Sequence, residues 1–236
     1  MTTEHASAPR VAAAWGVHAF TASGAVVGAL ALLAIVTGQL SRAALLLLVG
    51  LFIDSVDGTL ARKVGVARVL PQVDGRRLDD IVDYLNYVIV PVVFLVAAGS
   101  VTHWAWAALP ILASAYGFSQ TDAKTEDDFF LGWPSYWNVV ALYLWLLEIS
   151  PLAGTLWVCL FAALVFVPLK YVYPSRMPVL RRSTNVLAGA WLLVMAFAVT
   201  WPDWARSVRL VEASLFFPAW YVVLSVTLGG LRRRRA

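Results

Sequence analysis

Long apolar runs constrain this chain more than any other feature, because eight of them follow one another with little polar sequence between. They lie near residues 17–38, 42–62, 79–99, 103–121, 135–149, 152–170, 184–201 and 212–230. A helix needs about 20 mostly apolar residues to cross the core of a bilayer. With 61% hydrophobic and 14% charged residues, the composition excludes an ordinary soluble domain. We therefore predict an all-α fold, a polytopic integral membrane helical bundle of about eight transmembrane helices that forms one domain over residues 1–236.

The start of the chain is expected to lie outside the hydrocarbon core. Residues 1–16 are predicted to form an N-terminal tail, in which APRVAAAWG forms a short amphipathic helix on the membrane surface. The polar start and the length of the first apolar run argue against a cleavable signal peptide. A single cysteine, Cys159, excludes an internal disulfide.

Basic residues predict the orientation, because cytoplasmic loops of membrane proteins carry an excess of Lys and Arg. With both termini cytoplasmic, 15 of the 18 basic residues fall in cytoplasmic segments, and only Arg42, Arg206 and Arg209 fall outside. Topology and the C-terminal run RRRR then explain the net charge of +4. We therefore expect no nucleic-acid partner.

Six of the 14 acidic residues lie between Asp54 and Asp83, where two apolar runs meet. A carboxylate near the middle of a bilayer costs roughly 2.5–3.5 kcal/mol. Because residues three and four apart share one face of a helix, each helix carries a polar stripe. The first holds Asp54, Asp57, Gly58 and Ala61 with Arg62 beside them, and the second holds Gly75, Asp79 and Asp83. Asp80 lies about 100° around the helix and is expected to face elsewhere.

Two such helices joined by a short loop would present four carboxylates to each other. Unpaired, this cluster would be severely unfavourable, whereas two divalent cations would neutralise it through the oxygen ligands that Mg²⁺ and Mn²⁺ prefer. Paired metal ions are typical of phosphoryl transfer. Gly58 and Ala61 leave room for a nucleotide against the backbone, and Arg62 offers a fork of donors to a phosphate.

Other interpretations remain open at this point. A single intramembrane aspartate can serve helix packing or proton relay, and the carboxylates could form structural salt bridges with Arg62, Arg76 and Arg77. A cation-coupled transporter would also hold an ion among aspartates. Transporter sites usually lie near the bilayer midplane, however, whereas this cluster is predicted at one membrane edge with phosphate-binding residues interleaved.

The pattern D-x₂-D-G-x₂-A-R…G-x₃-D-x₃-D resembles the signature of the CDP-alcohol phosphotransferases, and every fixed position from Asp54 to Asp83 is filled. Twelve residues separate Arg62 from Gly75, where most of the family has fewer. The longer spacing is similar to that of the bacterial phosphatidylcholine synthases, a branch of this family. The stretches VHAFTASGA, FLGWPSYWNVV and KYVYPSR resemble the same branch.

This resemblance implies a helical homodimer in the bacterial inner membrane, with an active site facing the cytoplasm. The implied reaction is phosphatidyl transfer from CDP-diacylglycerol to choline, which gives phosphatidylcholine and CMP and needs two Mn²⁺ or Mg²⁺ ions. It further implies that the metal ligands are Asp54, Asp57, Asp79 and Asp83, and that Asp83 is also the general base. The cytidine diphosphate site would comprise Gly58, Ala61, Arg62 and Gly75, with His18 and Thr21 from the first helix.

A quaternary ammonium group is usually held by aromatic faces and nearby carboxylates. Most of the 11 Trp and 8 Tyr residues are expected to be interfacial belt residues. The candidates for choline binding lie on the predicted cytoplasmic side: Tyr84, Tyr136, Trp137, Tyr171 and Tyr173. Glu126, Asp127 and Asp128 would add negative potential, although a solvated loop also accounts for them.

Basic residues between the sixth and seventh apolar runs, Lys170, Arg176, Arg181 and Arg182, offer a site for a phosphate or a lipid headgroup, although topology alone explains them. Such a patch would suit a phosphorylated acceptor, glycerol 3-phosphate or an inositol phosphate. Serine is a further alternative. The resemblance over nearly the whole chain favours choline.

Overall fold

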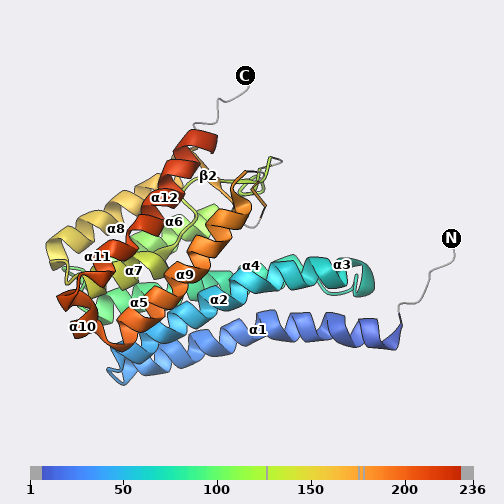
Figure 1. The fold of residues 1–236 in the computed structure, drawn as a ribbon, viewed down its shortest axis with the longest axis horizontal. Coiled ribbons are helices and arrows are strands. Elements are labelled where there is room, and N and C mark those ends of the chain that lie inside the picture. The colour runs from blue at the N-terminus through green and yellow to red at the C-terminus, as the bar shows by residue number, and fades with distance from the viewer. Residues whose placement is uncertain (1–6, 126, 175, 178, 230–236) are drawn as a thin grey trace.

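The computed structural model describes residues 7–125, 127–174, 176–177 and 179–229. The first six residues of the predicted tail, Glu126 and the run RRRR lie outside the described residues. Two long helices open the chain, α1 (Ala8–Val36) and α2 (Leu40–Val64), and they pack side by side (Figure 1). The prediction of a separate surface helix is wrong, because that stretch forms the first turns of α1. Pro9 stands there at a position that suits a helix start.

The next long helix runs from Gly75 to Ala97 and changes its pitch midway. It consists of α4 (Gly75–Asp83), the π-helical segment η1 (Tyr84–Ile89) and α5 (Val90–Ala97). In η1 the buried Asn86 donates a hydrogen bond to the carbonyl of Gly24 in α1 at 2.9 Å. Short π-helical segments often occur at functional sites. This one begins directly after Asp83.

The connection between α2 and α4 is folded. It contains the short helix α3 (Val66–Val69), and Val66 and Leu70 are buried against Ala14 and Val17 of α1. This small apolar cluster involves the part of α1 that was expected to lie apart as a surface helix. The longer spacing between the two halves of the acidic motif is therefore accommodated by packing on α1.

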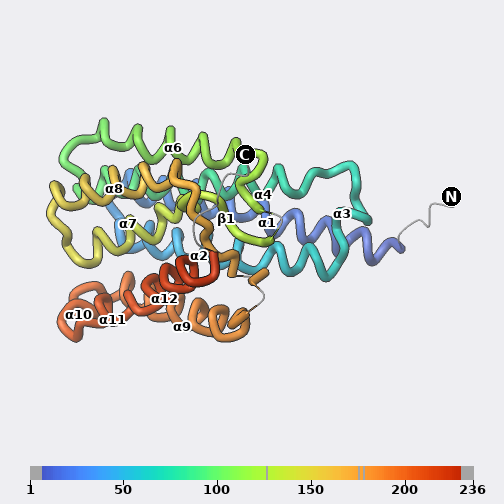
Figure 2. Tube along the Cα trace, turned by 90° about the horizontal axis from the view of Figure 1, so that it is seen from above, coloured from blue at the N-terminus to red at the C-terminus, as the bar shows by residue number. Residues whose placement is uncertain are grey.

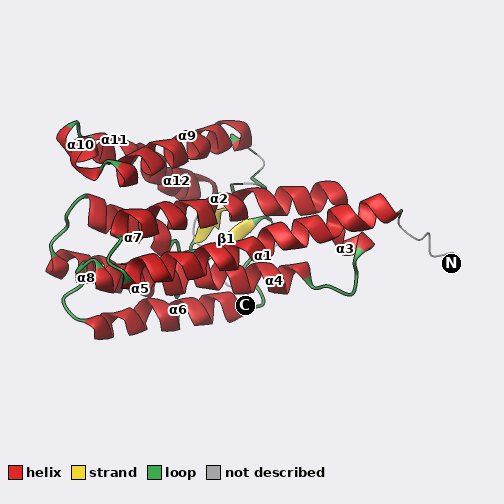
Figure 3. Cartoon of the chain, turned by 90° about the horizontal axis from the view of Figure 1, so that it is seen from below, coloured by secondary structure: helices red, strands yellow, loops and turns green. Residues whose placement is uncertain are grey.

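The remaining segments are η2 (Trp104–Ala107), α6 (Ala108–Ser119), β1 (Phe129–Leu131), α7 (Trp137–Leu146), α8 (Pro151–Val165), β2 (Lys170–Val172), α9 (Arg181–Thr200), α10 (Pro202–Ser207), α11 (Leu210–Ser214), α12 (Phe216–Leu224) and η3 (Ser225–Gly229). Figures 2 and 3 show that α9 to α12 form a separate layer alongside the other helices. Helix α9 packs against α2, so the C-terminal layer adjoins the helix that carries Asp54 and Asp57.

The sequence analysis did not anticipate the two short strands. β1 and β2 pair antiparallel, with Phe130 opposite Tyr171. Helix α8 ends at Val165, well before the predicted end of that run at residue 170, because Pro168 cannot continue a helix and β2 follows at once. The sheet therefore fixes the two long connections that precede α7 and α9.

Five helices are long and apolar enough to cross a membrane, within the part of the chain that the structure describes. They are residues 8–36, 40–64, 75–97, 181–200 and 210–229, while α7 and α8 are shorter apolar helices. All eight predicted runs contain helix, although their ends differ by several residues. The predicted polytopic, all-helical membrane fold is confirmed in its class. The number of spans and the side of each terminus stay predictions.

Candidate active site

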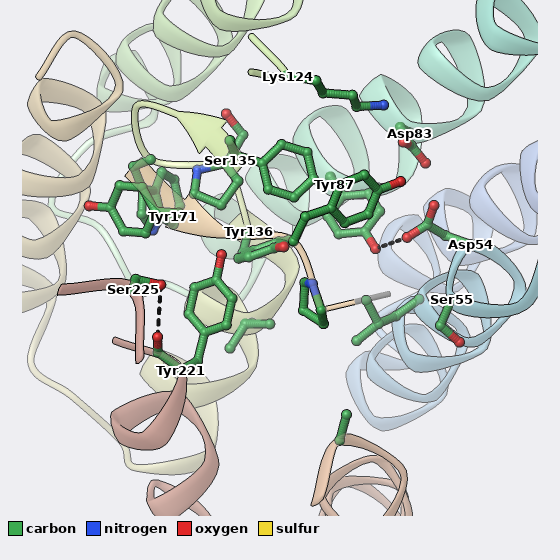
Figure 4. A pocket seen from close by; sticks show the side chains of 18 of the residues that line it. Asp54, Ser55, Asp83, Tyr87, Lys124, Ser135, Tyr136, Tyr171, Tyr221 and Ser225 are labelled. Carbon is green, nitrogen blue, oxygen red and sulfur yellow. Dashed lines mark hydrogen bonds between the residues drawn. The ribbon is translucent and has the colours of Figure 1, made fainter. Parts of the chain in front are cut away.

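Three carboxylates from two helices converge beside a large cavity. Asp54 and Asp57 of α2 and Asp79 of α4 each offer an oxygen, and these oxygens lie within 4.8 Å of one another. Asp83, one turn further along α4, lies within hydrogen-bonding reach of Asp54. The hydroxyl of Tyr87 donates a hydrogen bond to Asp54 at 2.5 Å (Figure 4). The prediction that the two acidic stripes face each other is therefore confirmed.

The donor set fits a divalent cation. Asp57 is only 4% exposed, and buried anions need pairing. None of the four carboxylates has a Lys or Arg within ion-pair distance among the described residues, so structural salt bridging does not explain the cluster. Clustered carboxylate oxygens are the ligands of Mg²⁺ and Mn²⁺.

Residues of the predicted nucleotide site divide into two groups. Gly58 and Arg62 line the cavity with the carboxylates. Gly75 instead faces α1, where an added Cβ would lie 3.0 Å from the His18 ring. His18 is buried, and its Nε2 has no hydrogen-bond partner among the described residues. Like Gly75, it lies outside the cavity lining, which favours a role in helix packing.

Three further residues differ from their expected places. Thr21 of α1 lies behind the cluster, where its hydroxyl hydrogen-bonds to Asp57. Ala61 packs in the small cluster around α3 and lies outside the cavity lining. Asp80 was expected to face elsewhere, which is wrong, because it lines the cavity next to Asp79. An additional carboxylate therefore faces the same space.

The cavity measures about 1530 Å³ and has two different ends. The carboxylates, Arg62 and Arg76 line the polar end. Apolar side chains from α8, α9 and α12 line another part, among them Trp157, Leu160, Phe161, Leu164, Leu192, Leu193, Phe217 and Val222. Several of these are open at the surface, and Leu193 is 74% exposed. Such a space suits an amphiphile with a charged head and apolar chains.

Lys124 is a cavity residue that the sequence analysis did not single out as a site residue. It lies between α6 and β1, lines the cavity, and points toward Asp83 in Figure 4. Its ammonium is close enough to Asp54, Asp79 and Asp83 to act electrostatically on all three. No periodic pattern marks it, because it stands in a loop. There Lys124 pairs with Phe130 of β1, and the ion pair between Lys170 and Asp127 joins the loop to β2.

Two of the four basic residues predicted to bind a phosphate or headgroup form ion pairs. Lys170 forms an ion pair with Asp127, and Arg176 forms one with Asp128 at 3.2 Å. The hydrogen bond from Lys170 holds the pKa of the Asp127 carboxyl below its usual range. These pairs tie the loop before β1 to β2 and the residues after it. Arg181 at the start of α9 does line the cavity, whereas Arg182 does not.

Two of the aromatic candidates for choline binding lie outside the cavity lining. Trp137 is fully buried and donates a hydrogen bond to Ser114, and the hydroxyl of Tyr84 donates one to the carbonyl of Ile111. The candidates that do line the cavity are Tyr136, Tyr171 and Tyr173, together with Tyr87 and Tyr221, which the sequence analysis missed. Nothing in the local pattern distinguishes these last two from other apolar-run tyrosines.

Comparisons with known proteins agree on one family. The family profile described as CDP-alcohol phosphatidyltransferase matches residues 18–208. A phosphatidylcholine synthase from Legionella pneumophila is 47% identical over 72% of this chain and 69% of its own length. Proteins of the same name from Borreliella burgdorferi and Pseudomonas aeruginosa are 40% and 37% identical, over 72% and 77% of this chain and 74% and 78% of their own lengths.

Proposed function

This chain belongs to the CDP-alcohol phosphatidyltransferase family, and on that premise we propose that it transfers a phosphatidyl group from CDP-diacylglycerol to choline. The products are phosphatidylcholine and CMP. The family assignment makes the chain a membrane-embedded phosphatidyltransferase. The observation that carries the proposal is the carboxylate cluster at the polar end of a cavity whose other part is apolar.

The polar end supplies the groups that phosphoryl transfer needs, which are mostly positioning and electrostatic stabilisation. Asp54, Asp57 and Asp79 would hold the divalent cations, with Asp83 close to them. When bound, two such ions, Mn²⁺ or Mg²⁺, neutralise the charge of the diphosphate and of the departing CMP. Arg62 and Lys124, which line the same cavity, bind phosphate oxygens of the donor. The apolar walls of α8, α9 and α12 accommodate the acyl chains.

Asp83 acts as the general base. An alcohol is a poor nucleophile at neutral pH, and a positioned carboxylate can remove its proton as it attacks. Here the choline oxygen attacks the phosphorus that bears diacylglycerol, the proton passes to Asp83, and the bond from that phosphorus to the CMP oxygen breaks. Asp83 suits this role because it lines the cavity and lies beside Asp54 without completing the three-carboxylate group.

Choline is favoured as the acceptor by the names of the relatives and by the tyrosines beside the carboxylates. We further propose a location in the bacterial inner membrane, with the active site open to the cytoplasm, and a homodimer. The excess of basic residues in the predicted cytoplasmic segments supports this orientation.

The proposal is tested by mass spectrometry of the lipids that the purified protein forms. The protein receives CDP-diacylglycerol, Mn²⁺ and an equal mixture of choline, serine, inositol and glycerol 3-phosphate. Phosphatidylcholine and CMP are expected from the wild type, and nearly none from Asp83→Asn. Asp74→Asn is the matched control. Asp74 caps α4 outside the cavity, and Asn caps helices as well as Asp does.

Each other outcome removes a defined part of the proposal. Another phosphatidyl lipid with CMP would keep the chemistry and replace the acceptor. Wild-type turnover by Asp83→Asn would remove the base assignment. Folded protein that forms no lipid and no CMP would contradict the enzyme and favour a cation-coupled transporter.

A further inference from the structure

Tyrosines from four segments meet at one end of the carboxylate cluster. Tyr87 of η1, Tyr136 before α7, Tyr171 of β2 and Tyr221 of α12 all line the cavity (Figure 4). The ring centroids of Tyr87 and Tyr136 lie 5.9 Å apart, those of Tyr136 and Tyr221 5.7 Å, and those of Tyr171 and Tyr221 6.5 Å. We propose that Tyr136, Tyr171 and Tyr221, called here the tyrosine box, bind the quaternary ammonium group of the acceptor. This inference rests on the proposed function and names its acceptor subsite.

The hydroxyls of Tyr136 and Tyr221 form hydrogen bonds within the protein, which fix the orientation of their rings. The hydroxyl of Tyr221 donates to the carbonyl of Val172 at 3.1 Å, and the hydroxyls of Tyr136 and Tyr221 hydrogen-bond to each other. Ser225 accepts a hydrogen bond from the amide of Val172 and donates one to the carbonyl of Tyr221. The strand that carries Tyr171 is thereby held against α12. The box is preorganised, which lowers the entropic cost of binding.

The chemistry of the box suits a cation that cannot donate hydrogen bonds. Such a group is attracted by the faces of aromatic rings and by nearby negative charge. Asp54 and Asp83 lie close enough to Tyr136 to act on it electrostatically. A phosphorylated acceptor would meet the same rings and carboxylates, which repel it. The box therefore selects a cationic alcohol over glycerol 3-phosphate or an inositol phosphate.

Neighbouring cations show why Tyr173 does not belong to the box. The guanidinium of Arg176 lies 5.5 Å from its ring centroid, and the ammonium of Lys124 lies 6.0 Å from it. Positive charges so close to one ring would repel a second cation there. Lys170, the neighbour of Tyr171 in β2, is paired with Asp127, which reduces its effect on the box.

The position of the box also places the reacting oxygen. Choline carries its hydroxyl two carbons from the nitrogen, so the hydroxyl must lie next to the ammonium site. Tyr87 joins the two regions, because its ring neighbours Tyr136 and its hydroxyl contacts Asp54. An ammonium group in the box therefore directs the hydroxyl toward the end of the cavity that holds Asp54 and Asp83.

The test compares choline with its uncharged carbon isostere, 3,3-dimethylbutan-1-ol, in steady-state kinetics. Tyr136→Leu and Tyr221→Leu remove a ring, whereas Tyr136→Phe and Tyr221→Phe keep it. We expect the Leu variants to raise the KM for choline by roughly ten- to thirtyfold, the Phe variants by a few-fold at most, and neither to change the KM for CDP-diacylglycerol. Tyr116→Leu is the control, since Tyr116 is exposed on α6 outside the cavity.

The wild-type protein alone gives a second readout that needs no folded variant, because the box predicts a strong preference for choline over the isostere. Equal use of both alcohols, or Leu variants with an unchanged KM for choline, would overturn the box while phosphatidylcholine synthesis stood. A wild type that forms no phosphatidylcholine would instead overturn the proposed function, and the box with it.

Discussion

The carboxylate cluster and the tyrosine box lie side by side but are assembled in opposite ways. The cluster comes from two helices that follow each other in the chain, with all four carboxylates between residues 54 and 83. The box draws on a loop, a strand and a C-terminal helix between residues 136 and 221. A site formed by two helices close in sequence can be predicted from residue spacing. A site built from distant segments depends on how the whole chain packs.

The largest effect on turnover is expected from a substitution in the carboxylate cluster. Changing Asp57→Asn removes one charged oxygen ligand, so we expect fewer bound Mn²⁺ ions and a fall in turnover of at least about a hundredfold. Electron paramagnetic resonance counts the bound Mn²⁺ independently of activity. Asp74→Asn serves again as the control. Unchanged Mn²⁺ stoichiometry and affinity in Asp57→Asn would show that the cluster is not the metal site.

The second prediction concerns a substitution that should disturb the tyrosine box, which distant segments form, and leave the carboxylate cluster intact. Gly132 follows β1 with φ +82°, and an added Cβ would lie 2.3 Å from the carbonyl oxygen of Val165. We expect Gly132→Ala to lower the free energy of unfolding by about 1–3 kcal/mol and to raise the KM for choline. Thermal unfolding in detergent measures the first effect.

Gly16→Ala is the matched control for this change, because nothing lies within 4 Å of a Cβ at that exposed position in α1. Mn²⁺ binding should survive in Gly132→Ala, since the carboxylates lie on α2 and α4. If Mn²⁺ binding fell as much as choline binding, the two regions would not be separable.

Residue spacing predicted the cluster for a physical reason. Asp54 and Asp57 share a helix face because they are three residues apart, and Asp79 and Asp83 because they are four apart. The class of fold followed from the apolar runs in the same way. The pairing of Phe130 with Tyr171 and the contact of Tyr221 with Val172 have no such signal. Chain segments more than 40 residues apart meet there, and only tertiary packing decides which ones.

The third prediction concerns Lys124, which lies in the loop before β1, outside the helices that carry the carboxylates, but faces the carboxylate cluster. We expect Lys124→Met to raise the KM for CDP-diacylglycerol about tenfold, because a charge-assisted hydrogen bond to the diphosphate is lost. The KM for choline should stay the same, and Lys124→Arg should retain most of the affinity for the donor. Lys63→Met, at the exposed end of α2 outside the cavity, is the control. A change confined to choline would assign Lys124 to the acceptor instead.

The smallest expected effect concerns the ion pair that fastens the loop of Lys124 to β2. The hydrogen bond from Lys170 holds the pKa of Asp127 below its ordinary value near 3.8. A carboxyl whose pKa is lower in the folded state stabilises that state above the ordinary pKa, and the stabilisation is lost as the pH falls through the folded value.

The pair is partly exposed, so Asp127→Asn should cost at most about 1 kcal/mol at pH 7. The difference in thermal stability between wild type and variant should therefore shrink as the pH falls below about 3.8. Lys170→Met should show no additional loss when it is combined with Asp127→Asn. A difference that persists unchanged at low pH would mean that Asp127 stabilises the loop by other contacts, and that the loop does not depend on this pair to hold Lys124 over the carboxylates.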